Sequence, residues 1–518
     1  MTVSDKFSVK ELGAVFTPVK TVEYIISRLG KIEEEQKILD PCVGPGIFVK
    51  MLLKHGVKKE QIYAFDLDNR YRKQIENYGI NFTHVDSILS FNDESKNKFD
   101  FIVGNPPYLN KSSKYIKKHR NNLKKIYGDI NAHETYSMFI VNGIWRLKEG
   151  GILGFITSDS FLTLSTHKKL RDFILQSCLI NEITLAPTNL FEEQNVNTSP
   201  VIIILTKKTG SENKENRLSN EIRLIPRLQS EEDYQNPPLE YHIKQKKYFS
   251  LPFHIFHVNV EDQIIELFEK AHKLESFLKG FIGMHTHNNK KYIAAIEGSE
   301  LAGVFKKKNQ KIKKSEDKYR IISYREFNSD QWLPYLKRGG ADQYYRPIFE
   351  ALYWDKGAIE IYDIPQNVPF KKEGIVISGI SSRLAARYMP KGCYWDSNKA
   401  IGFIIEDNST SIEYMLGLLN SSLYNYLAKG IINNTNSIQI SGIHALPYII
   451  PSIEIKSKVE NIVRDIIEKK KLDQNYDYHV EQKEVDNEIF NLYSREFCFP
   501  ASLKKKLDLK YSIYAKRD

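Results

Sequence analysis

The amino-acid sequence predicts an α/β fold in which a doubly wound, mainly parallel sheet with an antiparallel edge hairpin precedes a second, α+β domain. Three observations support this prediction. Apolar strand patterns alternate with helical patterns over residues 17–206, which is typical of βαβ crossovers. Residues 99–104 are nearly all apolar, as a parallel strand covered on both faces is. The polar stretch 207–220 then separates this region from one in which the alternation is lost.

The elements of the first region follow one another in a regular order. The first helix begins at Thr17 and Pro18, an N-cap residue followed by a proline at the first helical position. Strands are expected at residues 37–40, 62–66, 99–104 and 152–157. Helices that alternate with them are expected at residues 48–55, 69–78, 133–148 and 166–177. No helical pattern separates the last two strands, which predicts the antiparallel hairpin, at residues 180–186 and 201–206.

Length and composition limit the class of protein. A chain of 518 residues exceeds one ordinary domain. We expect a first domain at residues 1–220 and a second at 240–518, with a charged helical segment at 453–493. The net charge of +11 fits a polyanionic partner. No apolar run approaches the ~20 residues of a membrane span, no signal-peptide core is present, and the 4 cysteines form no CxxC pair. These features favour a cytoplasmic protein without a zinc site or a disulfide framework.

Three motifs follow three successive predicted strands. The turn at residues 40–46, DPCVGPG, is rich in glycine and lets a ligand approach the backbone closely. Asp66 ends a strand about twenty residues later, where a carboxylate can accept hydrogen bonds from ribose hydroxyls, and Asp86 ends the strand after that. Plain turns and helix caps also have this composition, but strand ends of such a sheet converge on one crevice. The spacing matches neither GxGxxG nor GxxxxGKS, so NAD and ATP are poorly supported as ligands.

A fourth motif, NPPY at residues 105–108, directly follows the apolar strand 99–104. Its two prolines remove two backbone donors and stiffen the loop. The loop carbonyls and the asparagine side chain remain as fixed acceptors, with an aromatic ring beside them. This arrangement suits an exocyclic amino group that lies in the plane of a stacked base. The alternative is a proline-stiffened loop in which asparagine is a turn residue.

From about residue 12 to residue 206, the sequence resembles S-adenosylmethionine-dependent DNA adenine-N6 methyltransferases of restriction-modification systems. The matching segments are VFTP (15–18), DPCVGPGIF (40–48), AFDLD (64–68), VD (85–86), NPPY (105–108), GGILGFITSDSF (150–161) and LFEEQNVNTSPVIII (190–204). The order of these segments along the chain corresponds to the gamma arrangement, in which the cofactor motifs come first, NPPY second and a long variable region last. The resemblance implies a Rossmann-like methyltransferase sheet, S-adenosyl-L-methionine as the cofactor, and a C-terminal target-recognition domain that binds double-stranded DNA.

The resemblance also implies roles for individual residues. Those expected around the methionine part of the cofactor are Thr17, Pro18, Asp40, Cys42, Gly44 and Gly46. Those expected at its ribose and adenine are Asp66, Leu67, Asp86, Ser87 and Ile88. Those expected at a flipped target adenine are Asn105, Pro106, Pro107, Tyr108 and Phe191. Asn105 and Pro106 would accept hydrogen bonds from the amino group, while Tyr108 and Phe191 would pack on opposite faces of the base.

The implied reaction is direct transfer of the activated sulfonium methyl group to adenine N6, without a metal ion or a covalent enzyme intermediate. The lone pair of the amino group is delocalised into the ring, and hydrogen bonds to Asn105 and Pro106 would localise it on nitrogen. Preorganised dipoles of this kind are typically worth ~3 kcal/mol each. A base inside a duplex must flip out to reach the crevice, and stacking on aromatic rings offsets that cost.

Basic and aromatic residues interleave in the second region, from residue 306 to residue 346. This composition suits contacts with DNA phosphates and grooves, although any one lysine also fits a solvated loop. The candidate DNA-binding residues are Lys291, Tyr292, Lys306, Lys307, Lys308, Arg325, Arg338 and Arg383. His285 and His287 have no third ligand near them in the sequence, so no metal site is predicted.

Three alternatives remain open. A protein glutamine methyltransferase also uses NPPY, because a side-chain amide is likewise a planar NH2 group, but the long basic second region argues against it. A fused restriction-methylation enzyme needs a nuclease carboxylate-lysine cluster, and we find none that is convincing, so a restriction endonuclease would be encoded separately. A catalytically idle DNA-binding subunit would tolerate a broken NPPY, whereas this motif is intact.

Overall fold

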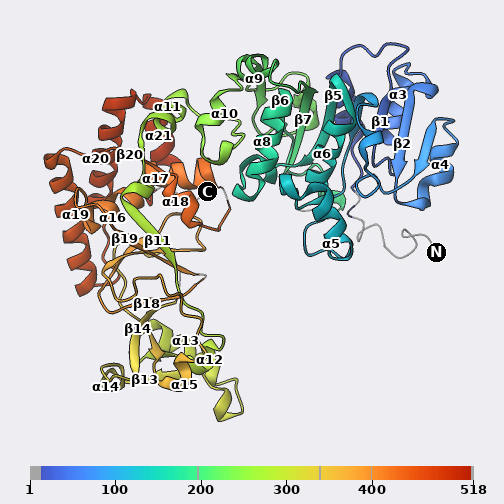
Figure 1. Ribbon diagram of the computed structural model, residues 1–518. Helices are drawn as coiled ribbons and strands as arrows, with labels where there is room; N and C mark the ends of the chain where they lie inside the picture. The colour runs from blue at the N-terminus through green and yellow to red at the C-terminus, as the bar shows by residue number, and fades with distance from the viewer. Residues whose placement is uncertain are drawn as a thin grey trace. The chain divides into compact units, whose positions relative to one another are not determined.

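The computed structural model describes residues 13, 15–194, 198–337, 340–397, 399–433 and 435–514. The chain forms two compact units, residues 1–261 and 262–518 (Figure 1). The sequence predicts the boundary between residues 220 and 240, whereas residues 221–261 lie in the first unit. Among the described residues, none of the helices combines the length and the apolar content that crossing a bilayer requires.

A nine-stranded sheet organises the first unit, in the order β3-β2-β1-β4-β5-β7-β6-β8-β9. Its strands are β1 (Ile38–Asp40), β2 (Ile62–Asp66), β3 (Asn81–His84), β4 (Phe99–Gly104), β5 (Leu147–Ser158), β6 (Cys178–Leu185), β7 (Pro200–Lys207), β8 (Glu221–Ile225) and β9 (Tyr241–Lys244). The five strands from β3 to β5 run parallel, and β7 is antiparallel to both β5 and β6. The predicted doubly wound sheet is therefore confirmed.

Helices cover both faces of this sheet. They are α2 (Val19–Ser27), α3 (Ile47–Lys54), α4 (Arg72–Glu76), α5 (Lys114–Tyr127), α6 (Thr135–Arg146), α7 (Ser160–Thr163), α8 (Lys168–Ser177), α9 (Lys214–Ser219) and α10 (Lys247–Ser250). A Cβ atom at Gly154 of β5 would meet Ile25 of α2 at 2.9 Å, and one at Gly143 of α6 would meet Leu153 of β5 at 2.6 Å. Because neighbouring residues of a strand point to opposite faces, α2 and α6 pack on opposite sides of β5.

The antiparallel β6–β7 pair is present, but it does not form the edge of the sheet. β8 pairs in parallel with β6, and β9 pairs antiparallel with β8, so the edge hairpin is β8–β9. Glu182 of β6 is fully buried, accepts a hydrogen bond from the Tyr24 hydroxyl at 2.6 Å and forms ion pairs with Arg28 and Arg223 at 2.9 Å. Removing one partner of a buried ion pair is costly, so this cluster ties β8 to the sheet.

The second unit combines small sheets with a helical end, which confirms the predicted α+β class. Its sheets have the orders β11-β19-β16-β17, β13-β12-β15-β14-β18 and β10-β20. The strands are β10 (His272–Lys273), β11 (Leu278–Ile282), β12 (Ile293–Ile296), β13 (Arg320–Ile322), β14 (Trp332–Leu336), β15 (Glu350–Tyr353), β16 (Gly374–Ser378), β17 (Ala386–Met389), β18 (Tyr394–Trp395), β19 (Ala400–Ile405) and β20 (Pro447–Tyr448).

The helices of the second unit lie mostly near its C-terminal end. They are α11 (Asp262–Lys270), α12 (Asn289–Tyr292), α13 (Glu300–Asn309), α14 (Tyr324–Phe327), α15 (Lys356–Ile359), α16 (Ile412–Asn420), α17 (Ser422–Asn425), α18 (Ile440–His444), α19 (Ile453–Leu472), α20 (His479–Phe497) and α21 (Ala501–Lys510), with a π-helical turn at Tyr426–Ile432. The helical segment predicted at 453–493 is two helices, because the chain leaves helical geometry at Asp473.

Candidate active site

A cavity opens at the carboxyl ends of the parallel strands of the first unit. Asp40 ends β1, Asp66 ends β2, and Asn105 directly follows β4. These ends meet because parallel strands deliver their carboxyl termini to one side of a sheet. The lining residues include the predicted Thr17, Asp40, Cys42, Gly44, Asp66, Leu67, Asp86, Ser87, Ile88, Asn105 and Pro107. The convergence that the motif order predicts is thus present in the tertiary structure.

The glycine-rich turn and Asp66 hold each other in place. One Asp66 carboxylate oxygen accepts a hydrogen bond from the Gly44 amide at 2.7 Å, and the other accepts from the Asp68 amide at 2.6 Å. Gly46 does not line the cavity. Its φ of 88° lies in the left-handed region, and a Cβ atom there would stand 2.6 Å from the Ile75 side chain. The glycine at position 46 therefore serves the turn and its packing rather than a ligand contact.

Burial sets the electrostatics of the cavity. Burial raises the pKa of Asp40 to about 8, and the nearby negative charge of Asp66 adds to the shift. Burial also raises the pKa of Asp66 to about 6. Among the described residues, the lining contains four aspartates, Asp40, Asp66, Asp68 and Asp86, and neither a lysine nor an arginine. A cationic ligand relieves the repulsion between these carboxylates, whereas a phosphate group would increase it.

S-adenosyl-L-methionine fits this set of groups. It carries a cationic ammonium and a cationic sulfonium, which suit an acidic cavity, and hydroxyl and amino donors, which suit free carboxylate lone pairs. Asp40 and Asp66 would face its positive and hydroxyl-bearing parts, and Asp86 its adenine. The Asp86 carboxylate already accepts from the amides of Ile88 and Leu89 at 3.2 and 3.0 Å and from the Tyr115 hydroxyl at 2.7 Å. These three donors fix the orientation of Asp86 within the cavity.

The most informative group in the cavity is the side-chain amide of Asn105. Its Nδ2 donates to the Val15 carbonyl and to the Thr17 hydroxyl, both at 3.0 Å. Its Oδ1 is buried and accepts no hydrogen bond from any described residue. Buried acceptors are nearly always satisfied, so an unpaired acceptor on a residue that lines a cavity is a candidate partner for a ligand donor. No hydrogen bond within the described part of the chain uses the Pro106 carbonyl either.

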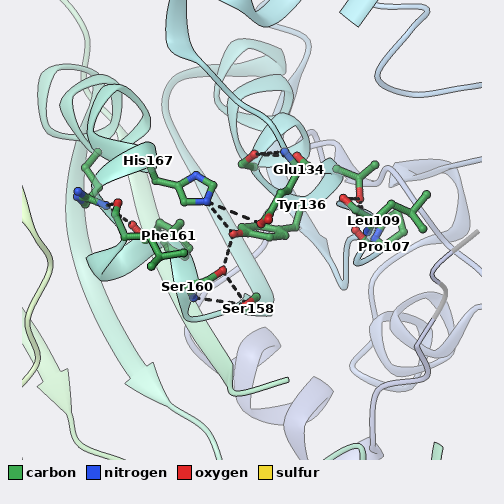
Figure 2. A network of polar contacts seen from close by, with 12 residues as sticks. Pro107, Leu109, Glu134, Tyr136, Ser158, Ser160, Phe161 and His167 are labelled. Carbon is green, nitrogen blue, oxygen red and sulfur yellow. Dashed lines mark hydrogen bonds and ion pairs between the residues drawn. The ribbon is translucent and has the colours of Figure 1, made fainter. Parts of the chain in front are cut away.

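The N-terminal end of α6 holds the NPPY loop. The Thr135 hydroxyl donates to the Pro107 carbonyl and accepts from the Leu109 amide at 2.9 Å, and the Tyr108 amide donates to the Gly13 carbonyl at 3.1 Å. Figure 2 shows that the loop lies on one side of this helix end and that a second polar group lies on the other. α6 thus positions the loop without using the acceptors on Asn105 and Pro106.

The polar group on the far side of α6 joins this helix to the end of β5. The Tyr136 hydroxyl lies 2.7 Å from the Ser160 hydroxyl and 3.3 Å from Nε2 of His167 (Figure 2). Burial lowers the pKa of His167 to about 4, with a further contribution from Arg171. His167 is therefore neutral at neutral pH. Because none of these residues lines the cavity, we assign them a structural part in holding α6 against β5.

Tyr108 and Phe191 do not have the arrangement that the resemblance implies. Their ring centroids are 6.3 Å apart with an interplanar angle of 61°, and Phe191 is only 1% exposed. Two rings that pack on both faces of one base would be parallel and roughly 7 Å apart, at two contact distances of about 3.5 Å. The rings contact each other edge to face instead, so a base enters between them only if they separate.

Several residues at the cavity are absent from the sequence-based set. They are Val15, Phe16, Pro41, Val43, Pro45, Ile47, Phe48, Asp68, Tyr71, Leu109, Tyr115, Thr135 and Phe139. Conversely, Pro18, Gly46, Pro106, Tyr108 and Phe191 belong to the predicted set but do not line the cavity. The sequence offers no spacing signal for Tyr115 or Thr135, because both follow NPPY on helices whose placement depends on the rest of the unit. Asp68 does have a signal, since it lies within the AFDLD segment.

The candidate DNA-binding residues of the second unit differ in exposure. Lys291, Lys306, Lys307, Lys308 and Arg325 are exposed, and Arg383 is half-buried. Tyr292 is 4% exposed and packs against Tyr362 in the core, so it cannot read bases in this conformation. Trp332 and Tyr344 of the interleaved segment are likewise buried. Arg338 lies outside the described residues.

The structure supplies a third group near His285 and His287. The three side chains that lie together are His285, His287 and Asp363. Nε2 of His287 stands 2.8 Å from the Asp363 carboxylate, and Nδ1 of His285 accepts from the His287 amide at 3.2 Å. The third group is close in space although it is distant from both histidines in the sequence. However, these groups already satisfy one another at an exposed surface, and nothing else there indicates a metal ion.

Comparisons with known proteins agree with the cavity and with the division into two units. Residues 48–191 match the Eco57I restriction-modification methylase family, and residues 317–447 match the TaqI-like C-terminal specificity domain. The first match falls within the first unit and the second match within the second unit. The resemblance stated from the motifs is confirmed, and the methylase match confirms S-adenosyl-L-methionine as the cofactor.

The chain matches only part of the length of each individual relative. The chain is 29% identical over 240 residues to the Type II methyltransferase M.BstVI of Geobacillus stearothermophilus, covering 38% of this chain and 42% of the relative. It is 25% identical over 348 residues to the adenine-specific methyltransferase PglX of Lacticaseibacillus casei, covering 63% of this chain and 27% of the relative. The chain thus spans less than half the length of these curated relatives.

One solved structure shows the fold over most of the chain. It is a nuclease-deletion mutant of the Type ISP restriction-modification enzyme LlaGI in complex with a DNA substrate mimic. The TM-score is 0.53 at 16% identity, over 90% of this chain and 56% of the other. At this identity the likeness concerns the fold alone.

Proposed function

We propose that this protein is a site-specific DNA methyltransferase that transfers a methyl group from S-adenosylmethionine to the N6 amino group of a flipped-out adenine in double-stranded DNA. It would protect host DNA in a restriction-modification system. The observation that carries the proposal is the unpaired, buried Oδ1 of Asn105 at the cavity. An acceptor in that position calls for a planar NH2 donor, and the adenine amino group is one.

The chain's own groups account for the chemistry at nitrogen. The cofactor supplies a methyl group on a sulfonium centre. Asn105 Oδ1 and the Pro106 carbonyl would each accept one N–H of the target amino group and so localise its lone pair. The new N–C bond forms as the S–C bond breaks, and the extra proton on nitrogen leaves to water. Because Val15 and Thr17 fix the Asn105 amide from behind, its dipole is in place before the reaction begins.

The remaining contacts with the base are also part of the proposal. Tyr108 would stack on the flipped adenine, after its edge contact with Phe191 opens. Flipping costs a few kcal/mol, and stacking on an aromatic ring returns roughly 1–3 kcal/mol. One relative is described as adenine-specific, and this description supports adenine as the target base.

The second unit would select the DNA sequence. Its match to a specificity domain supports this assignment, as do the exposed Lys306, Lys307 and Lys308 on α13. Neutralising these three lysines should weaken binding to all duplexes about equally. It should also flatten the salt dependence by nearly one log-log unit for each phosphate that the variant no longer binds. A change in the methylated sequence without a change in salt dependence would show that the lysines read bases instead.

The test of the proposed reaction uses the full chain, S-adenosylmethionine with a deuterated methyl group, and DNA from a host that lacks adenine methylation. Mass spectrometry of the digested nucleosides should find the label in N6-methyladenine. Label in N4-methylcytosine would correct the target base. Label in a protein glutamine, with none in DNA, would overturn the DNA assignment in favour of the glutamine alternative. A matched reaction with Asn105→Ala should give no labelled nucleoside.

A further inference from the structure

Helix α5, directly after the NPPY loop, carries a concentration of positive charge that none of the motifs accounts for. Residues 101–128 contain no aspartate and no glutamate. The cationic side chains of this segment are Lys111, Lys114, Lys117, Lys118, Arg120, Lys124 and Lys125. All of them are exposed. In Figure 1, α5 lies at the end of the first unit beside α6.

The two faces of α5 differ completely. Tyr115, Ile116, Leu123 and Tyr127 are buried, and their positions project onto one face of the helix. The exposed cations fill the opposite face. This face is not balanced by acids, because Lys111, Lys117, Lys118, Arg120, Lys124 and Lys125 form no ion pair with any described residue.

Such a face is unfavourable for the isolated helix. Arg120 and Lys124 stand at i,i+4 spacing, and so do Lys114 and Lys118. Like charges at this spacing destabilise a helix, and an ordinary solvated helix intersperses acids among its bases. A polyanion bound along the face would remove the repulsion. The charge pattern therefore favours a bound polyanion over plain solvent.

The buried face places this helix at the active site. The Tyr115 hydroxyl donates to Asp86 at 2.7 Å, and Tyr115 lines the cavity. Only five residues separate Tyr108 from Lys114, a span of at most about 20 Å for an extended chain. The exposed face of α5 thus lies within the distance at which the backbone of a duplex must run if one of its bases enters the NPPY site.

We propose that the exposed face of α5, formed by Lys117, Lys118, Arg120, Lys124 and Lys125, binds the phosphate backbone of the DNA duplex that flanks the flipped base. This inference rests on the proposed function and adds a DNA contact of the methylase unit to those expected of the specificity unit. It is a sequence-independent contact, because lysine and arginine bind phosphates without distinguishing bases.

The test uses the full chain with Lys117→Gln, Lys118→Gln and Lys124→Gln combined. The control combines Lys31→Gln, Lys50→Gln and Lys59→Gln, three exposed lysines on other parts of the same unit. Binding of a mixed-sequence DNA duplex is followed by fluorescence anisotropy as salt is raised from 50 mM to 200 mM. Each phosphate that is no longer bound flattens the slope of log affinity against log salt concentration by about 0.9. For three phosphates, the ratio of the variant Kd to the wild-type Kd should therefore fall roughly 40-fold as salt rises over this range.

Two further measurements separate the possible results. Calorimetry should show unchanged S-adenosylmethionine affinity for the α5 variant, which establishes that the cavity is intact. An α5 variant that keeps the wild-type salt slope, while the wild type binds duplex and methylates it, would overturn the α5 contact and leave the proposed function standing. A wild-type chain that neither binds duplex nor methylates DNA would overturn both.

Discussion

Replacing Asn105 by alanine removes the acceptor to which the proposed chemistry assigns the target amino group. The structure shows which contacts the substitution removes. Nδ2 is held by two hydrogen bonds of 3.0 Å to Val15 and Thr17, while Oδ1 is buried and unpaired among the described residues. The acceptor is therefore oriented in advance, and loss of one preorganised group of this kind costs about 2.7–4 kcal/mol, or 10²–10³ in kcat.

A second variant tests how much of the loss in kcat comes from the orientation of the Asn105 amide. Thr17→Val removes one of the two anchors of the Asn105 amide and keeps the acceptor itself. A neutral hydrogen bond contributes about 0.5–1.5 kcal/mol net, so kcat should fall by about tenfold or less. The assay is single-turnover transfer of a labelled methyl group to duplex DNA under saturating conditions, together with separate binding measurements for cofactor and DNA.

The result that refutes this reasoning is specific. Asn105→Ala should bind cofactor and DNA within a few-fold of wild type, since Asn105 acts on the transition state rather than on ground-state binding. If Asn105→Ala keeps kcat within tenfold of wild type, the unpaired Oδ1 is not the acceptor of the reacting amino group. If Thr17→Val is as damaging as Asn105→Ala, the orientation of the amide matters more than the acceptor.

Three further predictions concern the cofactor cavity and the fold. Because the pKa of Asp40 is about 8, a cation that needs the ionised carboxylate should bind roughly 50-fold more tightly at pH 8 than at pH 6. Calorimetry on Asp40→Asn should show that this pH dependence is absent. Gly46→Ala should lower the free energy of unfolding by about 1–2 kcal/mol because of its positive φ, and by about 1 kcal/mol more because of overpacking. Gly56 has a φ of 82° and nothing near the position of a Cβ atom, so Gly56→Ala should show only the cost of the positive φ. Denaturant titration measures both changes. Fragment 1–261 should bind cofactor and elute as a monomer in size-exclusion chromatography. Fragment 1–220 lacks the edge strands β8 and β9 and should elute as an aggregate. A well-folded fragment 1–220 would contradict the role of that edge.

Much of the first unit is predictable from its sequence because the information is local. Apolar runs, glycine turns and N-cap residues determine where β1, β2, β4 and β5 lie, within a few residues of their observed bounds except at the start of β5. The parallel order then brings Asp40, Asp66 and Asn105 together, since strand ends on one side of a sheet are neighbours. The cofactor class is implied by the family resemblance that the same local motifs carry.

Other features depend on contacts between distant residues. The edge of the sheet is an example, because the buried Glu182 draws in Arg223 from 41 residues away. Tyr115 reaches Asp86 across 29 residues, and periodicity carries no sign of such a contact. Arg28 joins the same Glu182 cluster from the end of α2. These contacts hold β8 in the first unit, which extends to residue 261.

The sequence by itself determined that an asparagine and two prolines follow a buried strand, and hence that fixed acceptors stand at the end of a parallel sheet. Only the tertiary structure decided which acceptors are free. Val15 and Thr17, 90 and 88 residues before Asn105, occupy its Nδ2 and leave Oδ1 unpaired among the described residues. Packing likewise closes Tyr108 against Phe191 and gives α5 one buried and one basic face. The physical reason is that residue type sets which bonds a side chain can make, whereas its neighbours in space set which of them it has already made.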